Sequence, residues 1–332
     1  MTGRSRILVT GGCGFIGSHL VDALCARGDQ VVVLDDLSTG RAGSIRPQLE
    51  RGSARLVEGD VADPGTVEPL VRKVDRIYHL AAAVGVAYIV RDPIGAARTN
   101  VRGTQTVLEA AFRNGVPILF ASSSEVYGKS AKLPFHEDDD RVLGTTSVQR
   151  WSYSTAKAMD EHLALAYAGS GLPVSVVRYF NSYGPRLDER GYGSVIARFV
   201  SQALTGRPLT VHGDGTQTRC FTYVTDTVRG TVLAAETAAA RGRVINIGAG
   251  EEITIADLAR TIRELVGSTT PIHLVPYADE YGPGFEDAPR RIPDTRRARE
   301  LLGFVAEVPL RTGLSRTIDW CRANFALETS AP

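Results

Sequence analysis

The chain has 332 residues, of which 43% are hydrophobic and 23% charged, and its formal net charge at pH 7 is +1. A chain of this length buries about three quarters of its unfolded surface, so we expect one large domain or two closely packed lobes. A net charge so near zero provides no long-range field for a polyanion, which argues against nucleic acid as a partner.

The residue pattern also argues against a membrane protein and against a metalloprotein. No apolar stretch approaches the ~20 residues that a membrane helix needs, and the first residues lead into an apolar run without the pattern of a signal peptide. The four cysteines are scattered without CxxC spacing, and the six histidines form no ligand motif. We therefore expect a cytoplasmic protein with reduced thiols, no membrane segment and no metal site.

Short apolar runs alternate with segments of helical periodicity as far as residue 178. The predicted strands are Ile7–Thr10, Gln30–Leu34, Arg55–Glu58, Ile77–Leu80, Ile118–Ala121 and Val174–Arg178. The predicted helices are Phe15–Arg27, Thr66–Val74, Ile94–Arg113 and one that carries Tyr153 and Lys157 and ends near Tyr167. This alternation is typical of an α/β fold with a doubly wound parallel sheet and right-handed crossovers, the Rossmann type.

Beyond Asn181 this alternation stops, and closely spaced glycines and prolines separate short elements. Val244–Ile247 is a further predicted strand, and Thr254–Asp257 has the pattern of a capping box that opens a helix. We therefore expect a Rossmann domain over residues 1–180 that carries the catalytic groups, and a smaller substrate-binding lobe over residues 181–332. Some segments of this lobe should return to the main sheet, and the rest should cover the carboxyl ends of its strands.

The glycine-rich segment 11–17 follows the first strand directly and opens the first helix. Its glycines allow a tight turn and the close approach of a pyrophosphate to the helix N-terminus, whose dipole favours anions. A purely structural glycine turn is the alternative, which this strand–turn–helix context disfavours. The candidate cofactor contacts within the segment are Gly11, Gly14, Phe15, Ile16 and Gly17.

The acidic residue that such a site requires follows about 20 residues later, because Asp35 ends the second predicted strand. Its carboxylate would accept hydrogen bonds from ribose hydroxyls, and with Asp36 it would repel a 2′-phosphate, so we expect NAD rather than NADP. Further candidate contacts follow the third strand, where Asp60 and Val61 would hold the adenine. The segment after the fourth strand would pass beneath the phosphates, with Leu80, Ala81 and Ala82 as contacts.

Tyr153 and Lys157 are four residues apart, so on a helix they project from the same face. A free phenol has a pKa of about 10, and lowering it to 7 takes about 4 kcal/mol. A lysine ammonium and a cationic nicotinamide, both close to the phenol, would favour the phenolate. The pair therefore predicts a base that removes a proton from an alcohol while NAD⁺ accepts the hydride, with both residues also touching the cofactor.

Taken together, these motifs resemble the extended short-chain dehydrogenase/reductase family, in particular its nucleotide-sugar epimerases, dehydratases and decarboxylases. The resemblance covers nearly the whole chain. It includes the glycine segment, Leu80–Ala82, Asn100–Thr104, Ser122–Gly128, the Tyr153–Lys157 pair and Arg178–Arg186. It implies that Ser123, Tyr153 and Lys157 are catalytic, with Ser123 bound to the sugar 4-hydroxyl, and that Asn100 and Ser122 contact the cofactor. Taken singly, Ser123 could be a strand-end hydroxyl and Tyr153 a surface aromatic.

Glu125 indicates the subclass, because decarboxylases and dehydratases of this family resemble the chain in placing a glutamate there. Oxidation of a hexuronate at C4 makes a β-keto acid that loses its carboxylate readily. Glu125, or a water that it holds, could then protonate C5. The Ser124-Glu125 pair is closer to the decarboxylase pattern than to the dehydratase Asp-Glu. An exposed loop carboxylate is the alternative interpretation of Glu125.

The C-terminal third resembles the UDP-binding part of the UDP-glucuronate decarboxylases, in segments 209–213, 215–226 and 287–291. By this resemblance Arg219 clamps the diphosphate or the sugar carboxylate, and Arg291 is a second diphosphate arginine; an arginine fork suits either anion. The candidate substrate contacts are Asn181, Val195, Thr210, His212, Arg219 and Arg291. The leading hypothesis is an NAD-dependent UDP-glucuronate decarboxylase that forms UDP-xylose, with some 4-keto intermediate released.

Two features favour a UDP-hexose or UDP-hexuronate 4-epimerase instead. The residues between Tyr153 and Lys157, Ser-Thr-Ala, and the segment Ala83–Val86 after the fourth strand are both nearer to epimerases. An NAD-sensing module without catalysis is a third hypothesis, which the intact serine, tyrosine and lysine oppose. Relatives commonly form dimers through the two long helices, so we expect a homodimer with Val107, Ala111, Leu163 and Tyr167 as contacts.

Overall fold

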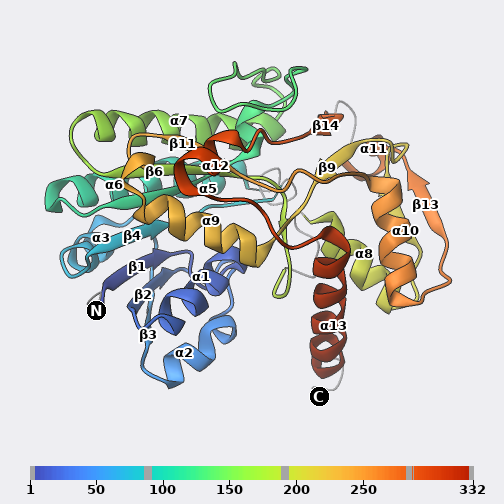
Figure 1. Cartoon of the computed structure of the whole chain (residues 1–332), viewed down its shortest axis with the longest axis horizontal. Coiled ribbons are helices and arrows are strands. Elements are labelled where there is room, and N and C mark those ends of the chain that lie inside the picture. Colours follow the sequence, from blue (N-terminus) through green and yellow to red (C-terminus); the bar gives the residue numbers. More distant parts are fainter. Residues whose placement is uncertain (1–3, 86–91, 188–193, 282–285, 287, 329–332) are drawn as a thin grey trace.

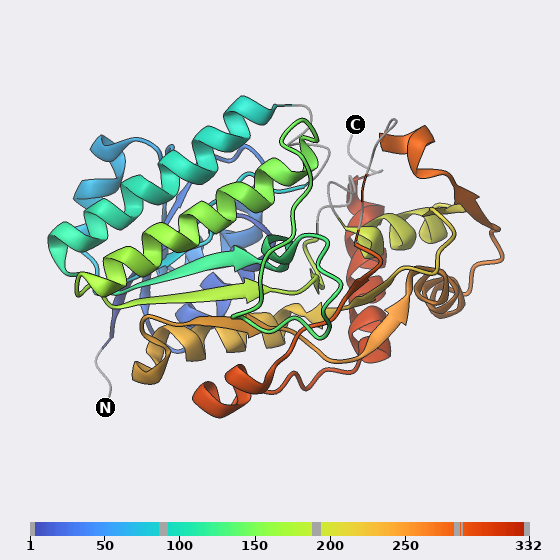
Figure 2. The same cartoon turned by 90° about the horizontal axis from the view of Figure 1, so that it is seen from above.

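The computed structural model describes residues 4–85, 92–187, 194–281, 286 and 288–328 (Figure 1). Two residues of the motifs above, Val86 and Asp287, lie outside these ranges. The described chain forms a large parallel sheet covered by helices on both faces, with a second group of helices and short strands at one end of the sheet (Figures 1 and 2).

The central sheet has seven strands, all parallel. In spatial order they are β11 (Val244–Ile247), β6 (Val174–Tyr179), β5 (Ile118–Ser123), β4 (Arg76–His79), β1 (Arg6–Thr10), β2 (Gln30–Asp35) and β3 (Ala54–Glu58). The strand order reverses between β1 and β4, which makes the carboxyl ends of these two strands the expected ligand crevice. The predicted doubly wound sheet is confirmed.

Helices cover each face of this sheet because its strands are apolar on both sides. One face packs against α3 (Pro64–Val71), α6 (Gly103–Asn114) and α7 (Arg150–Gly169). The other face packs against α1 (Phe15–Ala26), α9 (Val224–Glu236) and α12 (Arg296–Leu302), with α2 (Arg46–Glu50) beside α1. Figure 2 shows α6 and α7 side by side across their face of the sheet.

The second group of elements has its own apolar core, built on α8, α10 and α13. Its helices are α8 (Val195–Leu204), α10 (Ile255–Val266), α11 (Tyr277–Tyr281) and α13 (Leu310–Glu328). Its short strands are β7 (Ser182–Tyr183), β8 (Leu209–His212), β9 (Thr218–Cys220), β10 (Thr222–Tyr223), β12 (Glu252–Thr254), β13 (Ile272–Val275) and β14 (Arg290–Arg291). The domain boundary expected near residue 180 stays a prediction, while β11 of the C-terminal half pairs with β6 in the main sheet.

Two predicted helices show how local signals agree with the fold or differ from it. Thr254 is the N-cap of α10, and its hydroxyl accepts a 3.0 Å hydrogen bond from the Asp257 N–H, as the capping pattern predicts. The predicted helix 94–113 is instead α5 (Pro93–Ala97), a π-helical turn at Arg98–Arg102, and then α6. Within that turn the Asn100 amide binds the backbone of Ala83, so the wider turn fixes the segment that follows β4.

No helix among the described residues combines the length and apolar character that crossing a membrane requires.

Candidate active site

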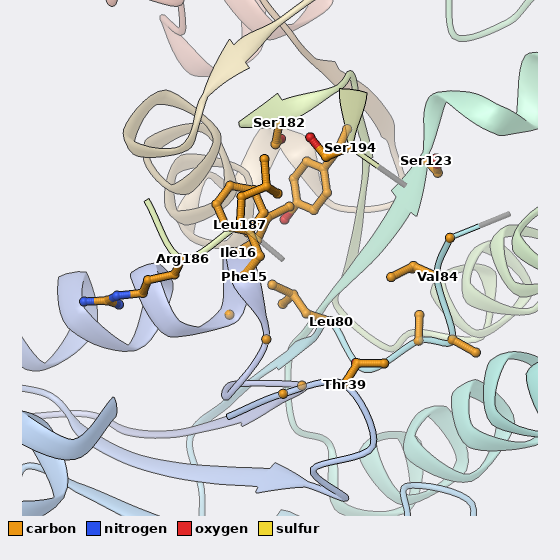
Figure 3. A pocket seen from close by; sticks show the side chains of 18 of the residues that line it. Phe15, Ile16, Thr39, Leu80, Val84, Ser123, Ser182, Arg186, Leu187 and Ser194 are labelled. Atoms are coloured by element: carbon orange, nitrogen blue, oxygen red, sulfur yellow. The ribbon is translucent and has the colours of Figure 1, made fainter. Parts of the chain in front are cut away.

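A cavity of about 1320 Å³ lies where the carboxyl ends of the sheet strands meet the second group of elements. It extends from the glycine-rich turn before α1 to residues of α8, β9 and β14. Figure 3 shows part of its lining, with Phe15, Leu80 and Ser123 contributed by the Rossmann domain and Ser194 by the segment before α8. The cavity exceeds the ~300–1,000 Å³ of an ordinary small-ligand pocket, and its size suits a dinucleotide together with a nucleotide sugar.

The glycine-rich turn is shaped for close backbone approach. Gly11 has φ +70°, and a Cβ on Gly17 would lie only 2.1 Å from the Gly11 carbonyl oxygen, so neither position tolerates a side chain. The turn brings Gly14 and the first residues of α1 to the cavity wall. This arrangement presents the N-terminal end of the helix to a pyrophosphate, and all five residues predicted in the segment line the cavity.

Asp35 lies at the end of β2 and is 6% exposed. Its carboxylate accepts hydrogen bonds from the N–H groups of Cys13 at 2.8 Å and Leu37 at 3.0 Å, one on each oxygen. Burial, which outweighs these bonds, raises the pKa of Asp35. Each oxygen can accept a further bond, so the side chain can brace the glycine turn and still bind a ribose. Asp36 is exposed and accepts hydrogen bonds from Ser38.

Three predicted contacts do not line this cavity, although all three are among the described residues. Asp60 accepts a hydrogen bond from the Ala62 N–H, and Asn100 holds Ala83. The Thr210 hydroxyl accepts a hydrogen bond from Gln202. Ser122 does line the cavity, but its hydroxyl donates to Glu161, so its side chain serves the sheet–helix contact. These interactions occupy one polar atom or more of each of the four side chains, and their contacts with a cofactor or substrate stay predictions.

Ser123, Tyr153 and Lys157 all line the cavity, Ser123 at the end of β5 and the other two on α7. Burial raises the pKa of Tyr153 and the charge of Glu125 raises it further, whereas the Ser123 hydroxyl lowers it. The Lys157 ammonium donates to the Ala121 carbonyl at 3.0 Å. The lowering of the phenol pKa expected from Lys157 is therefore not seen in this structure, and the lowering expected from a cationic nicotinamide stays a prediction.

Glu125 lies between two arginines from distant parts of the chain. The Arg291 guanidinium donates to its carboxylate at 2.5 Å, and Arg150 lies 3.6 Å from the other carboxylate oxygen. Burial opposes the charge on Glu125, but the charges of Arg291, Arg150 and Arg219 outweigh it and lower the pKa of Glu125 to about 2. The carboxyl is therefore ionised at neutral pH and cannot itself donate a proton, which corrects one branch of the prediction. The other branch, a water held by Glu125, is compatible with this geometry.

Arg291 and Arg219 become neighbours because β14 pairs with β9 in parallel, with these two residues in register. Both guanidinium groups are buried and line the cavity, as do Asn181, Val195 and His212. The Asn181 amide donates to the Cys220 carbonyl at 3.0 Å, which ties the chain after β6 to β9. The arrangement concentrates positive charge beside the Ser123–Tyr153 pair, where an anionic ligand would be held.

Sequence reasoning missed several residues of the cavity wall. Arg150 precedes Tyr153 by three residues, and this helical spacing is a signal that could have identified it. Arg198 lines the cavity and contacts His212 at 3.3 Å, and Tyr277 closes over Gly213. Arg186, at φ +65°, pairs with Asp22 of α1 at 2.7 Å. No local pattern marked Arg198 or Tyr277, because their positions depend on how the second group of elements packs. Arg186 ends the motif Arg178–Arg186, but sequence reasoning predicted no role for it.

Among the described residues, no cluster of three or more histidine, cysteine or acidic side chains could hold a metal ion.

Comparison with known proteins relates this site to a large group of enzymes. Residues 7–248 match the model of the "NAD dependent epimerase/dehydratase family". A UDP-N-acetyl-alpha-D-glucosaminuronate decarboxylase of Bacillus cytotoxicus is 43% identical over 96% of this chain and 98% of its own length. UDP-glucuronic acid decarboxylase 1 of Danio rerio is 39% identical over 96% of this chain and 72% of its own length.

The fold has close counterparts among solved structures. UDP-glucose 4-epimerase of Thermotoga maritima, solved with UDP-glucose, superposes with a TM-score of 0.88 at 33% identity, over 96% of this chain and 99% of its own. The resemblance to nucleotide-sugar enzymes inferred from the motifs is thereby confirmed. The chain belongs to the NAD dependent epimerase/dehydratase family, and it is an enzyme that takes NAD as its cofactor.

Proposed function

We propose that this enzyme is a UDP-hexuronate decarboxylase, with UDP-glucuronate as its substrate and UDP-xylose as its product. The observation that carries the proposal is the position of Glu125 between Arg291 and Arg150, in the cavity wall that also holds Ser123 and Tyr153. A hexuronate brings a carboxylate to this cluster in addition to its diphosphate, whereas a neutral hexose brings the diphosphate alone.

The arginines of this cluster suit an anionic sugar. Arg150, Arg219 and Arg291 all line the cavity, and all three act on the carboxylate of Glu125. A diphosphate and a hexuronate carboxylate are both planar or branched oxyanions that an arginine fork can bind through two hydrogen bonds.

The residues present fit NAD and a chemistry at sugar C4. When bound, NAD supplies the acceptor for the hydrogen removed from C4 and returns it after decarboxylation. Tyr153 holds the proton of the 4-hydroxyl, and Ser123 orients that hydroxyl. Arg150 and Arg291 hold the carboxylate, whose loss from a 4-keto sugar leaves its electron pair on the C4 oxygen. A water oriented by Glu125 then delivers a proton to C5.

Two further candidates each rest on a specific observation. The relative of 43% identity and 98% coverage is named for UDP-N-acetyl-glucosaminuronate, the 2-acetamido analogue of UDP-glucuronate. A 4-epimerase is favoured by the residues between Tyr153 and Lys157 and by the fold shared with the Thermotoga enzyme. The first candidate changes only the substituent at C2, whereas the second keeps all carbon atoms of the sugar.

One assay separates these candidates. Purified enzyme with NAD is incubated in turn with UDP-glucuronate, its 2-acetamido analogue and UDP-glucose, and the sugar products are followed by NMR. We expect loss of C6 from UDP-glucuronate, with UDP-xylose and some 4-keto product. Decarboxylation of the acetamido sugar alone would reassign the substrate. Retention of C6 in every product would refute the decarboxylase and favour the epimerase.

We also propose a homodimer formed through α6 and α7. Two of the contacts expected from sequence, Val107 and Ala111, are fully buried against the sheet and cannot lie in an interface. The exposed apolar side chains of these helices are instead Phe112, 43% exposed, and Met159, 48% exposed. A cytoplasmic location stays a prediction, supported by four cysteines that are free thiols.

A further inference from the structure

Asp160 is a buried carboxyl group that the catalytic motif does not explain. It lies three residues after Lys157 on α7 and is 0% exposed. Neither of its carboxylate oxygens has a hydrogen-bond partner among the described residues. Burying a polar group without a partner costs free energy of folding, so the presence of a carboxyl group at this position needs a physical explanation.

A chain of side-chain contacts leads from the segment after β4 toward Asp160. The Ala81 N–H donates to the Thr10 hydroxyl at 3.2 Å, and that hydroxyl lies 2.7 Å from His79 Nδ1. On the other side of the ring, His79 Nε2 lies 3.2 Å from the Thr104 hydroxyl. The Thr104 hydroxyl in turn interacts with the Asp160 carboxyl group and lowers its pKa.

The direction of these hydrogen bonds follows from His79 and Asp160. Burial, with a contribution from Lys157, lowers the pKa of His79 to about 3, so the ring is neutral at pH 7 and has one donor and one acceptor nitrogen. An ionised Asp160 only accepts hydrogen bonds, and the Thr104 hydroxyl is the nearby group that can turn its proton toward it. In that orientation His79 Nε2–H donates to Thr104, and Nδ1 accepts from Thr10. All donors along the chain then point toward Asp160.

Lys157 is the positive charge that Asp160 can balance. Its ammonium is buried, donates to the Ala121 carbonyl at 3.0 Å and lies 4.6 Å from the centre of the Phe120 ring. Burial lowers the pKa of Lys157, whereas the charges of Asp160 and Glu161 raise it.

Glu161 already forms an ion pair with Arg178, whose guanidinium donates to its two carboxylate oxygens at 2.9 and 2.6 Å. Of the two carboxylates that act on Lys157, this leaves Asp160 to compensate the ammonium. Burial raises the pKa of Asp160 to about 6, although Lys157 and Thr104 both favour the charged form. At neutral pH the Asp160 carboxyl is therefore ionised and can act as the counter-charge of the ammonium.

We propose that Asp160 is the buried counter-ion of Lys157, a positioning residue that keeps the ammonium charged and, through Thr104 and His79, couples it to the loop beneath the cofactor. The inference rests on the proposed role of Lys157 as the partner of Tyr153. Asp160 lines no part of the cavity and acts only through Lys157. The ionisable groups around it are Tyr153, Lys157 and Glu161 of α7 and His79 of β4, with Arg178 of β6 beyond Glu161.

The test is a direct titration of the lysine. The chain has only four lysines, Lys73, Lys129, Lys132 and Lys157, so lysine labelled with ¹³C at Cε gives a spectrum of four signals. Lys157→Met assigns the signal of interest, and the other three lysines are internal references. In Asp160→Asn we expect the pKa of Lys157 to fall by about one unit or more, the scale of a nearby unit charge in a buried site. An unchanged value would overturn the proposal.

A conservative pair of variants keeps the test decisive if Asp160→Asn does not fold. Asp160→Glu retains the charge, and in it the pKa of Lys157 should stay closer to the wild-type value. Thr104→Val removes the donor to Asp160, so it should raise the pKa of Asp160 and lower that of Lys157 in part. A Lys157 signal that is insensitive to both changes would also overturn the proposal.

The pH dependence of turnover provides a second measurement. Removing a negative charge disfavours protonation of its neighbours, so in Asp160→Asn the alkaline limb of the kcat profile should move to lower pH. A merely structural role would lower the melting temperature and leave the limb in place. Because the NMR titration requires no substrate, it tests the counter-ion even if the enzyme proves not to be a decarboxylase.

Discussion

Arg291 and Glu125 are joined by a 2.5 Å hydrogen bond across 166 residues of sequence. The contact forms because β14 pairs with β9 and brings Arg291 to the end of β5, where Glu125 follows Ser123. It turns a candidate acid into an ionised carboxylate and places an arginine where a hexuronate carboxylate would bind. The predictions below test this arrangement and the groups around it.

Tyr153→Phe should abolish most of the activity while the substrate still binds. Loss of a positioned acid–base group typically lowers turnover by 10²–10⁴-fold. The assay is decarboxylation of UDP-glucuronate by NMR, with substrate affinity measured by calorimetry. Tyr167→Phe, on the same helix but outside the cavity, is the matched control and should retain full activity. Normal turnover in Tyr153→Phe would rule out the phenol as the base.

Glu125→Gln should destabilise the fold, and the effect should depend on pH. The pKa of Glu125 falls from 4.5 to about 2 on folding, which corresponds to at most about 3 kcal/mol of unfolding free energy. Because the folded pKa is depressed, this stability is present above pH 4.5 and is lost as the pH falls through 2. Urea unfolding of both proteins at pH 7 and pH 3 checks it. The difference should be smaller at pH 3, and Glu50→Gln, at an exposed position, should show none.

Arg150→Lys should weaken the binding of UDP-glucuronate more than that of UDP-glucose. A lysine keeps the charge but loses the fork that binds a carboxylate through two hydrogen bonds, so we expect a loss of about tenfold for the acidic sugar. Calorimetry with both nucleotide sugars measures the ratio. Arg141→Lys, at an exposed position, is the control. An equal loss for both sugars would mean that Arg150 does not contact the carboxylate.

Asp35→Asn should reduce the preference for NAD over NADP. The carboxylate that would bind the ribose and repel a 2′-phosphate also accepts two backbone hydrogen bonds, so the neutral amide should weaken NAD binding by about tenfold. Fluorescence titration with both dinucleotides provides the measurement. The exposed neighbour supplies the control, because Asp36→Asn should have a smaller effect. Unchanged discrimination in Asp35→Asn would assign the preference to another residue.

Met159→Asp should separate the dimer into monomers. An unpaired charge buried in an interface is costly, whereas in the monomer this side chain is already half exposed. Light scattering gives the mass of each protein. Thr155→Asp, exposed on the same helix and one turn earlier, tests how far the contact extends. A monomeric wild-type protein would refute the proposed dimer.

Much of the fold could be predicted from the sequence, because the secondary structure and its order depend on local signals. The alternation of apolar runs and helical periodicity predicted the doubly wound sheet, and the strand–glycine–helix context at residues 11–17 predicted the cofactor turn. The helix predicted over 94–113 is present, but a π-helical turn replaces regular α-helical bonding at Arg98–Arg102, where Asn100 binds the backbone of Ala83. That contact joins segments 17 residues apart, which helical periodicity does not detect.

The residues of the candidate site also fall into those that local sequence signals predict and those that only the tertiary structure brings together. The i, i+4 spacing predicted Tyr153 and Lys157, and the family resemblance added Ser123 at the end of a strand; both signals are local, and the structure brings the three residues to one cavity. Only the tertiary structure decided the ionisation of Glu125, the place of Arg150 in the cavity wall and the pairing of Arg219 with Arg291. The physical reason is that charge and solvation act through space, so a side chain's protonation depends on neighbours that the chain delivers from more than a hundred residues away.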